Sequence, residues 1–337
     1  MNLGKPSNAN RVVLFPATVL MLLARSIAAF GQAADASPEM SVGSDLSVPS
    51  MVSAAFPMVS AIVAFVPLFA PETASTMPWV ANPIRLGAHV PLYWIDPCRA
   101  IGYSIAGLAL PAAGVGFMFA GPSIPVSQPL GASLMGGYFH LMEYAAYDTY
   151  RLGSRSRGGY DLLTLAAAPF SSENVFSPLV WVPSIVGPAS LVAFYLVFEP
   201  DLGVAVYKSG QSHIGSAQVS PALGGLSAAA FGTLDMLAVS VGEESYYRGI
   251  LYEEAKRSLG TWPARAMDMI LFPSIHLPTD ILAGLKAETI IFNFGWRSAM
   301  TLVFDLAYDA GGLPLSVSTH FWSDLVLIMA QWLFYGG

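Results

Sequence analysis

Long uncharged stretches of apolar residues dominate the pattern of hydrophobic and polar positions along the chain. Leu46–Pro71, Asn174–Phe198 and Ile214–Leu234 contain no charged residue, and Ala100–Phe139 is long enough for one helix and a turn rich in Pro and Gly. A helix needs about 20 mostly apolar residues to cross the hydrocarbon core of a bilayer, so each stretch is a candidate span. Three more stretches are apolar but contain charges: Ala264–Leu285, Thr289–Ala310 and Leu313–Tyr335.

These apolar windows are long and do not alternate as the strands of a membrane β-barrel do. Backbone groups in lipid must be hydrogen-bonded within the spanning segment, and a helix achieves this. The pattern therefore predicts an all-α, polytopic transmembrane helical bundle of about seven spans, with six to eight as the range.

The N-terminus is compatible with two interpretations. Basic residues precede the apolar run Val12–Ala24, and small residues follow it as far as Ala33, which is typical of a secretory signal. Arg25 interrupts the run, which is short for a span. Residues 1–33 are therefore either a signal peptide or a first membrane helix, and a polar linker follows them.

The composition agrees with a membrane protein. Charged residues make up 11% of the chain and hydrophobic residues 54%, and the mean hydropathy is +0.56. Soluble domains carry about 25% charged residues, so a disordered chain, a coiled coil and an ordinary soluble domain are excluded. The net charge of −7 also argues against a nucleic-acid partner. Cys98 is the only cysteine, so the chain has neither an internal disulfide nor a Cys metal cluster.

The polar residues of the N-terminal half suggest an orientation. Arg151, Arg155 and Arg157 form a dense basic cluster, which the positive-inside rule places on the cytoplasmic side. The preceding stretch from Gly137 is rich in Tyr and contains polar residues, so we expect an amphipathic helix at the membrane interface there.

Several ionisable residues lie inside the apolar stretches of the C-terminal part. They are Glu243 and Glu244, followed by His276, and then His320 and Asp324. One such group at mid-membrane costs about 2.5–3.5 kcal/mol on insertion scales, so they are not expected to face lipid singly. We expect them to share a polar cavity, and ionisable groups within a membrane are candidates for a functional site.

The spacing of these residues predicts contacts. Glu244 and Arg248 are four residues apart with the acid first, the favourable order for an ion pair on a helix. Arg248 would then hold one carboxylate while the adjacent Glu243 stays free to take a proton. His320 and Asp324 have the same spacing, and prolines on both sides of His276 predict a helix start or kink there. One carboxylate and two imidazoles from three helices form a candidate site for activating water.

These residues carry a resemblance to a known family. E-E-x-x-x-R from Glu243, F-x-x-x-H from Phe272 and H-x-x-x-D from His320 resemble the CPBP group of intramembrane glutamic endopeptidases, which includes CAAX prenyl proteases and bacteriocin-processing enzymes. The stretch Ala307–His320 also looks like the family's entry into its last motif helix. The resemblance covers roughly residues 220–335. It implies a catalytic membrane domain at 211–337, after an N-terminal membrane region at 34–210 with no assigned role.

The resemblance implies hydrolysis of a peptide bond without a covalent intermediate. Glu243 would be the general base and, with His276, would hold the attacking water. Glu244 with Arg248 would orient the site, and His320 with the residue at 324 would stabilise the oxyanion. Some relatives have Asn where this chain has Asp324. An ionised Asp only accepts hydrogen bonds, so Asp324 is either protonated or orients His320, and we favour the second.

Three alternatives stay open. No cofactor is expected, but a zinc enzyme could use the same Glu and His residues from separate helices, although the sequence contains no H-E-x-x-H. A catalytically silent scaffold could use the polar cluster to hold its helices together. A transporter could use buried carboxylates, but the chain shows no internal repeat. The leading hypothesis expects a membrane-associated peptide or protein substrate and a location in the bilayer of the bacterial inner membrane.

Overall fold

The chain folds into a bundle of helices with a short β-hairpin, as the computed structural model shows for residues 47–70, 77–120, 126–153, 159–198, 212–214 and 217–335. Its N-terminal elements are α2 Val48–Val63, α3 Val66–Phe69, α4 Met77–Leu86, η2 Gly87–Trp94, α5 Pro97–Phe119, α6 Ser127–Gly153, α7 Leu162–Ala167, η4 Ala168–Phe170, α8 Ser172–Val175 and α9 Pro178–Phe198. The C-terminal elements are β1 Ser212–Ile214, β2 Ala217–Val219, α11 Pro221–Tyr246, η6 Tyr247–Tyr252, α12 Glu253–Leu259, α13 Thr261–Ser274, α14 Leu277–Leu282 and α15 Ala287–Tyr335. The N-terminal segment 1–33 and the basic residues Arg155 and Arg157 lie outside the described residues.

Within the described residues, five helices are long and apolar enough to cross a membrane. They are Val48–Leu68, Pro97–Phe119, Pro178–Phe198, Pro221–Leu259 and Ala287–Ala330. The protein is therefore an integral membrane protein, and the predicted all-α, polytopic bundle is confirmed.

The C-terminal part is divided into helices differently from the prediction, which gave about seven spans for the whole chain. The stretch Ala264–Leu285 is broken into α13 and α14, each shorter than a span. The two predicted segments that follow it run on in α15, where they are joined at a kink at Gly312. Gly312 has φ of 70°, a conformation that glycine adopts without strain, so one glycine turns the chain between the two parts.

Three of the long helices begin with the same local sequence, a polar N-cap followed by proline. The N-caps are Ser47 for α2, Asp96 for α5 and Ser220 for α11, and each side chain accepts a hydrogen bond from a backbone N–H in the first turn. Proline fits the first turn because its missing N–H would have no partner there. This signal places the start of α11 at Pro221, whereas the apolar pattern had placed it at Ile214, which instead ends strand β1.

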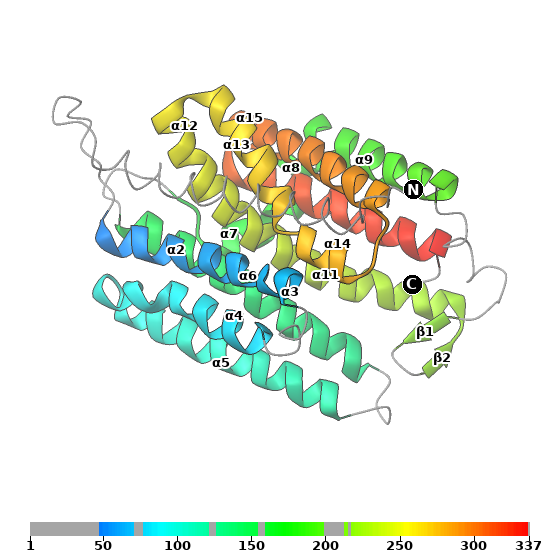
Figure 1. Cartoon of the computed structure of the whole chain (residues 1–337), viewed down its shortest axis with the longest axis horizontal. Helices are drawn as coiled ribbons and strands as arrows, with labels where there is room; N and C mark the ends of the chain where they lie inside the picture. Colours follow the sequence, from blue (N-terminus) through cyan, green and yellow to red (C-terminus); the bar gives the residue numbers. More distant parts are fainter. Residues whose placement is uncertain are drawn as a thin grey trace, which may run out of the picture.

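Helix α6 lies in the interior of the bundle, where it packs against α2, α5 and α11 (Figure 1). Its residues Tyr144, Tyr147 and Tyr150 are buried in the main core cluster together with residues of η6, α13 and α15. The expectation of an interfacial helix from Gly137 is therefore wrong. A helix whose polar residues pair with each other inside a protein has the same amphipathic pattern as a helix at the membrane surface.

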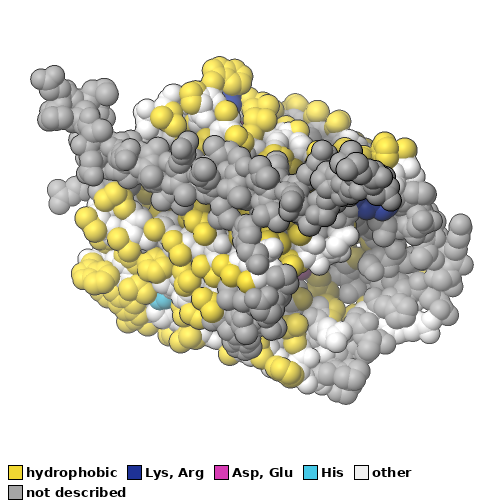
Figure 2. Space-filling model, in the orientation of Figure 1, with side chains coloured by type: hydrophobic (Ala, Val, Ile, Leu, Met, Phe, Trp, Pro, Cys, Tyr) yellow, Lys and Arg dark blue, Asp and Glu magenta, His cyan; other side chains and the backbone are white. Residues whose placement is uncertain are grey.

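The outer surface is largely apolar. Figure 2 shows hydrophobic side chains over much of the visible part of the described surface, with few charged side chains among them. On α5, for example, Ile105 is 64% exposed and Leu108 62% exposed. A soluble protein rarely presents so much contiguous apolar surface, and lipid explains it.

Candidate active site

Glu243 and Glu244 lie near the end of α11, one turn before the helix changes its winding. Helix α11 continues through the π-helical turn η6 into α12. At the junction the backbone N–H of Tyr247 donates to the carbonyl oxygens of both glutamates. Single π turns inside α-helices occur frequently at functional sites. Here the turn carries Arg248, which follows the two glutamates.

The Glu244 carboxylate is held on both of its oxygens. Oε1 lies 3.0 Å from Arg248 Nη1 and 2.7 Å from His320 Nδ1. The hydroxyl of Ser316 donates to Oε2. Glu244 and Arg248 are both fully buried, so the predicted ion pair on the helix is confirmed. A carboxylate with these three partners is fixed in position and has little capacity to accept another proton.

The adjacent Glu243 has a different environment. Its carboxylate makes no hydrogen bond to any residue that the structure describes, and its closest ionic contact is His320 Nε2, 3.9 Å from Oε2. The side chain of Glu243 is 9% exposed, against 0% for Glu244. Of the two neighbouring carboxylates, that of Glu244 is thus held by hydrogen bonds, and that of Glu243 is free to bind water.

His320, on α15, lies between the carboxylates of Glu244 and Asp324. Its Nδ1 faces Glu244, and its Nε2 is 3.1 Å from Asp324 Oδ2, as the spacing of four residues predicted. The ring stacks on Phe304 with centroids 4.5 Å apart. Only a ring with hydrogen on both nitrogens donates to both carboxylates, so this arrangement favours the imidazolium form.

His276 lies at the break between two helices. Helix α13 ends at Ser274 and α14 begins at Leu277, which confirms the helix boundary predicted from the two prolines. The His276 ring lies edge-on to Phe272 at 5.4 Å, and Phe272 in turn lies 6.0 Å from the His320 ring. The His276 ring makes no hydrogen bond to the described residues and interacts electrostatically with His320 and Asp324.

The structure therefore brings the six residues of the sequence-predicted site to one region. They come from α11 and η6, from the α13–α14 junction and from α15, and they are Glu243, Glu244, Arg248, His276, His320 and Asp324.

Two more carboxylates surround Arg248, and the sequence interpretation did not assign them to it. Asp305 Oδ1 lies 3.2 Å from Arg248 Nε, and Asp268 Oδ2 lies 3.3 Å from the same atom. Both aspartates are buried. Asp268 and Asp305 lie inside apolar stretches of the sequence, and this signal could have predicted that they pair with a buried cation such as Arg248.

A second polar group from the N-terminal region was also missed. His140 Nδ1 lies 2.9 Å from Glu143 Oε2 on α6, and Arg85 Nη1 from α4 lies 3.3 Å from Glu143 Oε1. Both His140 and Glu143 interact electrostatically with Glu243. The i,i+3 spacing of His140 and Glu143 inside a mostly apolar stretch was the signal in the sequence.

The described part of the chain contains no group of three or more His, Cys, Asp or Glu side chains arranged to hold a metal ion.

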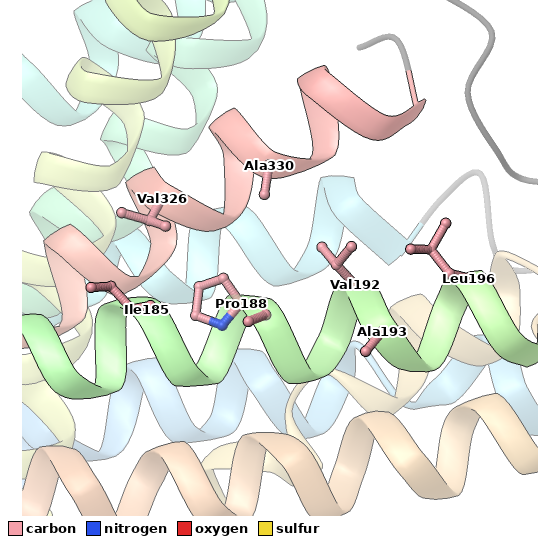
Figure 3. A pocket seen from close by; sticks show the side chains of 8 residues that line it. Ile185, Pro188, Val192, Ala193, Leu196, Val326 and Ala330 are labelled. Atoms are coloured by element: carbon pink, nitrogen blue, oxygen red, sulfur yellow. The ribbon is translucent and has the colours of Figure 1, made fainter.

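An apolar groove lies beside the C-terminal end of α15. It has a volume of about 380 Å³ and lies between α9 and α15, where Ile185, Pro188, Val192, Leu196, Val326 and Ala330 line it (Figure 3). Val326 follows Asp324 by two residues, which is about 200° around a helix. The groove therefore lies on the opposite side of α15 from the His320–Asp324 pair and does not belong to the site.

The comparisons with known proteins agree with the resemblance of the motifs to intramembrane endopeptidases. A family model described as type II CAAX prenyl endopeptidase Rce1-like matches residues 225–326. No curated protein and no solved structure matches the chain. The matched segment contains all six residues of the site, and the family is one of proteases, which are hydrolases. Residues 225–326 are thus similar to the Rce1-like type II CAAX prenyl endopeptidase family, in agreement with the resemblance seen in the motifs of the chain.

Proposed function

We propose that this protein is an intramembrane endopeptidase that hydrolyses a peptide bond with water activated by Glu243. The observation that supports this best is the contrast between the two adjacent glutamates. The Glu244 carboxylate is held by Arg248, Ser316 and His320, whereas the Glu243 carboxylate has no hydrogen bond within the described residues. A free carboxylate in a confined site is a suitable general base for water.

The proposed reaction needs no covalent intermediate. Glu243 accepts a proton from a water molecule while the water oxygen attacks the carbonyl carbon of the scissile bond. The C–N bond of the resulting tetrahedral intermediate then breaks, and Glu243 returns the proton to the leaving nitrogen. The products are a carboxylic acid and an amine, so all atoms of the water are accounted for.

The two histidines would assist at different positions. The His276 ring has no hydrogen-bond partner among the described residues, so it is available to hold the water beside Glu243. His320, whose ring donates to Glu244 and to Asp324 at 3.1 Å, would stabilise the oxyanion through the positive charge of its imidazolium. Donors that are fixed before the reaction stabilise developing charge most effectively. Glu244 and Arg248 would keep the His320 ring in place through Nδ1.

The substrate would be a membrane-associated peptide or protein. The printed description of the family names CAAX prenyl endopeptidases, so a peptide that ends in a prenylated CAAX sequence is the first substrate to test. We place the enzyme in the bacterial inner membrane, because the basic and apolar N-terminal segment has the pattern of an export signal or first anchor.

The test is to identify cleavage products. Full-length protein in liposomes is incubated with a farnesylated CAAX peptide or with native membrane peptides, and mass spectrometry compares wild type with Glu243→Ala. The proposal expects a product with wild type only. Equal product patterns, together with normal cellular function of the Glu243→Ala variant, would instead support the catalytically silent scaffold.

The zinc enzyme is the alternative to test, because Glu and His are common zinc ligands, although the described residues include no group of three or more such side chains arranged to hold a metal ion. The same assay is repeated after treatment with a chelator and after addition of zinc. The glutamate mechanism expects an unchanged rate. Loss of activity that zinc restores would support the metal-dependent alternative.

A further inference from the structure

The His276 ring is held less directly than the His320 ring. Two carboxylates contact the nitrogens of His320, whereas the His276 ring makes no hydrogen bond to the described residues and lies edge-on to Phe272 at 5.4 Å. The position of the His276 ring therefore depends on the backbone segment that carries it. That segment is the junction of α13 with α14, a helix of six residues.

Asp280 lies at the centre of the hydrogen bonds that define α14. Its backbone N–H donates to the carbonyl oxygen of His276 at 3.1 Å, and its own carbonyl oxygen accepts from the N–H of Leu285 at 3.2 Å. Gly284, with φ of 73°, donates to the carbonyl oxygen of Ile281 at 3.0 Å, so the helix ends in a Schellman motif. A helix this short is marginal by itself, so contacts with other helices must fix its position.

The side chain of Asp280 joins α14 to α15. Its two carboxylate oxygens accept from the two terminal nitrogens of Arg297, at 2.5 Å for Nη1–Oδ2 and 3.1 Å for Nη2–Oδ1. The side chain of Asp280 is 7% exposed and that of Arg297 22%. A paired contact of this kind fixes orientation as well as distance. Helix α14 contacts α15 and α3, and this ion pair is the charged part of that contact among the described residues (Figure 1).

Arg297 acts on His276 in two ways that an experiment can separate. It holds Asp280, which lies one helical turn after His276, and its positive charge interacts electrostatically with the imidazole. The Asp280 carboxylate neutralises much of that charge, because it binds both terminal nitrogens of the guanidinium. The effect on the position of α14 is therefore the stronger of the two.

We propose that Asp280 and Arg297 are positioning residues, which fix α14 against α15 and thereby place the His276 ring at the candidate site. This inference rests on the proposed function, because it concerns the histidine that would hold the water there. Both residues act through the backbone of α14 and have no part in the reaction itself. His276, which lacks hydrogen bonds of its own, is then as well placed as the ion pair allows.

The first test compares two ion pairs on α15. Arg297→Gln should lower kcat by about 10- to 100-fold with little change in KM, because a displacement of about 1 Å at a catalytic group has an effect of this size. Arg265→Gln is the matched control, since Arg265 joins α13 to α15 through Asp309 at 2.7 Å but lies near the start of α13, the end away from His276. The control should keep kcat close to that of wild type. Equal losses of kcat in the two variants would overturn the proposal.

A covalent bridge separates the position of α14 from the charge of Arg297. The double variant Asp280→Cys with Arg297→Cys is made in the Cys98→Ser background, so that the chain has no other cysteine. A short bifunctional thiol reagent then joins α14 to α15 again without restoring either charge. We expect a low kcat before the bridge forms and recovery of most of the lost rate afterwards. A bridged protein, verified by mass spectrometry, that stays as slow as the open form would contradict the positioning role.

A measurement without substrate keeps this inference separate from the proposed function. NMR spectra are recorded with isotope-labelled histidine, and the His276 signal is identified by its absence in His276→Ala. The open and bridged forms of the double variant carry the same charges, so a difference between their His276 signals reports the position of the ring. We expect the signal to move or broaden in the open form and to return toward that of wild type in the bridged form, while the signal of His89 stays unchanged.

The two readouts can fail independently. A wild-type His276 signal in the open form would overturn the inference even if the wild type cleaves peptides, and the expected change would support it even if no peptide is cleaved. Arg297→Lys is the second variant if the open form does not fold, because lysine retains the charge but not the paired contact. It should move the same signal, and an unchanged signal would again overturn the inference.

Discussion

The contacts of Asp324 indicate what its carboxylate does. Its Oδ2 accepts from His320 Nε2 at 3.1 Å, and the side chain is 25% exposed. An ionised aspartate has no hydrogen to donate, so it acts on an oxyanion only through the histidine. The other nitrogen of His320 is held by Glu244, and Asp324 therefore completes the orientation of the ring.

Two substitutions of Asp324 test whether its hydrogen bond to His320, and not only its size, contributes to catalysis. Asp324→Asn retains an acceptor oxygen for His320 and is expected to lower kcat by about tenfold or less. Asp324→Leu removes the acceptor and should lower kcat by about 10²-fold, in the range of general acid–base contributions. Initial rates of peptide cleavage in liposomes measure both. Equal losses in the two variants would show that the hydrogen bond to His320 is not used.

Arg248 is the buried cation that compensates the negative charge of the neighbouring carboxylates. Glu244, Asp268 and Asp305 all lie within 3.3 Å of its guanidinium, and Phe272 lies against it at 4.8 Å. Removing one member of a buried ion pair costs about 3–5 kcal/mol because the other charge is left without compensation. The cost should therefore depend strongly on which member is removed.

Arg248→Met is expected to destabilise the protein by about 3–5 kcal/mol, because three buried carboxylates lose their partner. Asp268→Asn should cost much less, since neither carboxylate oxygen of Asp268 has a hydrogen-bond partner in the described residues and two acids still face Arg248. Thermal unfolding in one detergent compares the two. A larger loss for Asp268→Asn would contradict this account of the cluster.

At the scale of the elements, the turn inside α15 sets the position of His320. Gly312 has φ of 70° and separates the part of the helix that carries Asp305 from the part that carries His320. After this turn Ser316 contacts Glu244, and His320 follows one helical turn later. The glycine therefore acts on the site through the direction of a helix and not through contact.

Gly312→Ala should destabilise the fold by about 1–2 kcal/mol, since a residue with a Cβ is strained in the left-handed region. Gly295→Ala on the same helix is the matched control, because a Cβ there meets nothing within 4 Å and alanine favours a helix. Melting temperatures of both variants give the comparison. A Gly312→Ala variant as stable as Gly295→Ala would show that the kink is not required.

The sequence predicted local relations within helices better than relations between them. The i,i+4 spacing correctly predicted that Glu244 contacts Arg248 and that His320 contacts Asp324, because helix geometry alone decides such pairs. The contacts of His140 with Glu143 and of both with the neighbourhood of Glu243 depend on how α6 packs against α11. An amphipathic pattern does not distinguish a helix that faces headgroups from one that pairs its polar residues inside the bundle.

At the scale of the whole molecule, one ion-pair network shows that the end of α6 and the start of α5 lie on the same side of the membrane. Asp148 near the end of α6 is bonded to Arg151 at 2.6 Å and to Arg99 at the start of α5 at 3.1 Å. The start of α5 therefore lies on the same side of the bilayer as Arg151. The positive-inside rule places that side in the cytoplasm.

Cys98 makes this topology measurable because it is exposed, lies at the start of α5 and is the only cysteine of the chain. A membrane-impermeant maleimide should label it in inverted vesicles and not in intact cells. Helix α5 has 23 residues, about 34 Å at 1.5 Å per residue, which spans the hydrocarbon core. The variant Cys98→Ser with Ala120→Cys should give the reverse pattern. Labelling of Cys98 from outside intact cells would contradict the orientation.

The central claim is that the carboxylate of Glu243, left free while Glu244 is held, activates water for peptide hydrolysis. The most direct measurement is the single-turnover rate of Glu243→Gln against Glu288→Gln, an exposed acid at the start of α15, in identical liposomes. We predict that Glu243→Gln lowers the rate by about 10²–10⁴-fold with an unchanged melting temperature, and that Glu288→Gln matches wild type. A Glu243→Gln variant that cleaves the peptide at the wild-type rate would contradict the account.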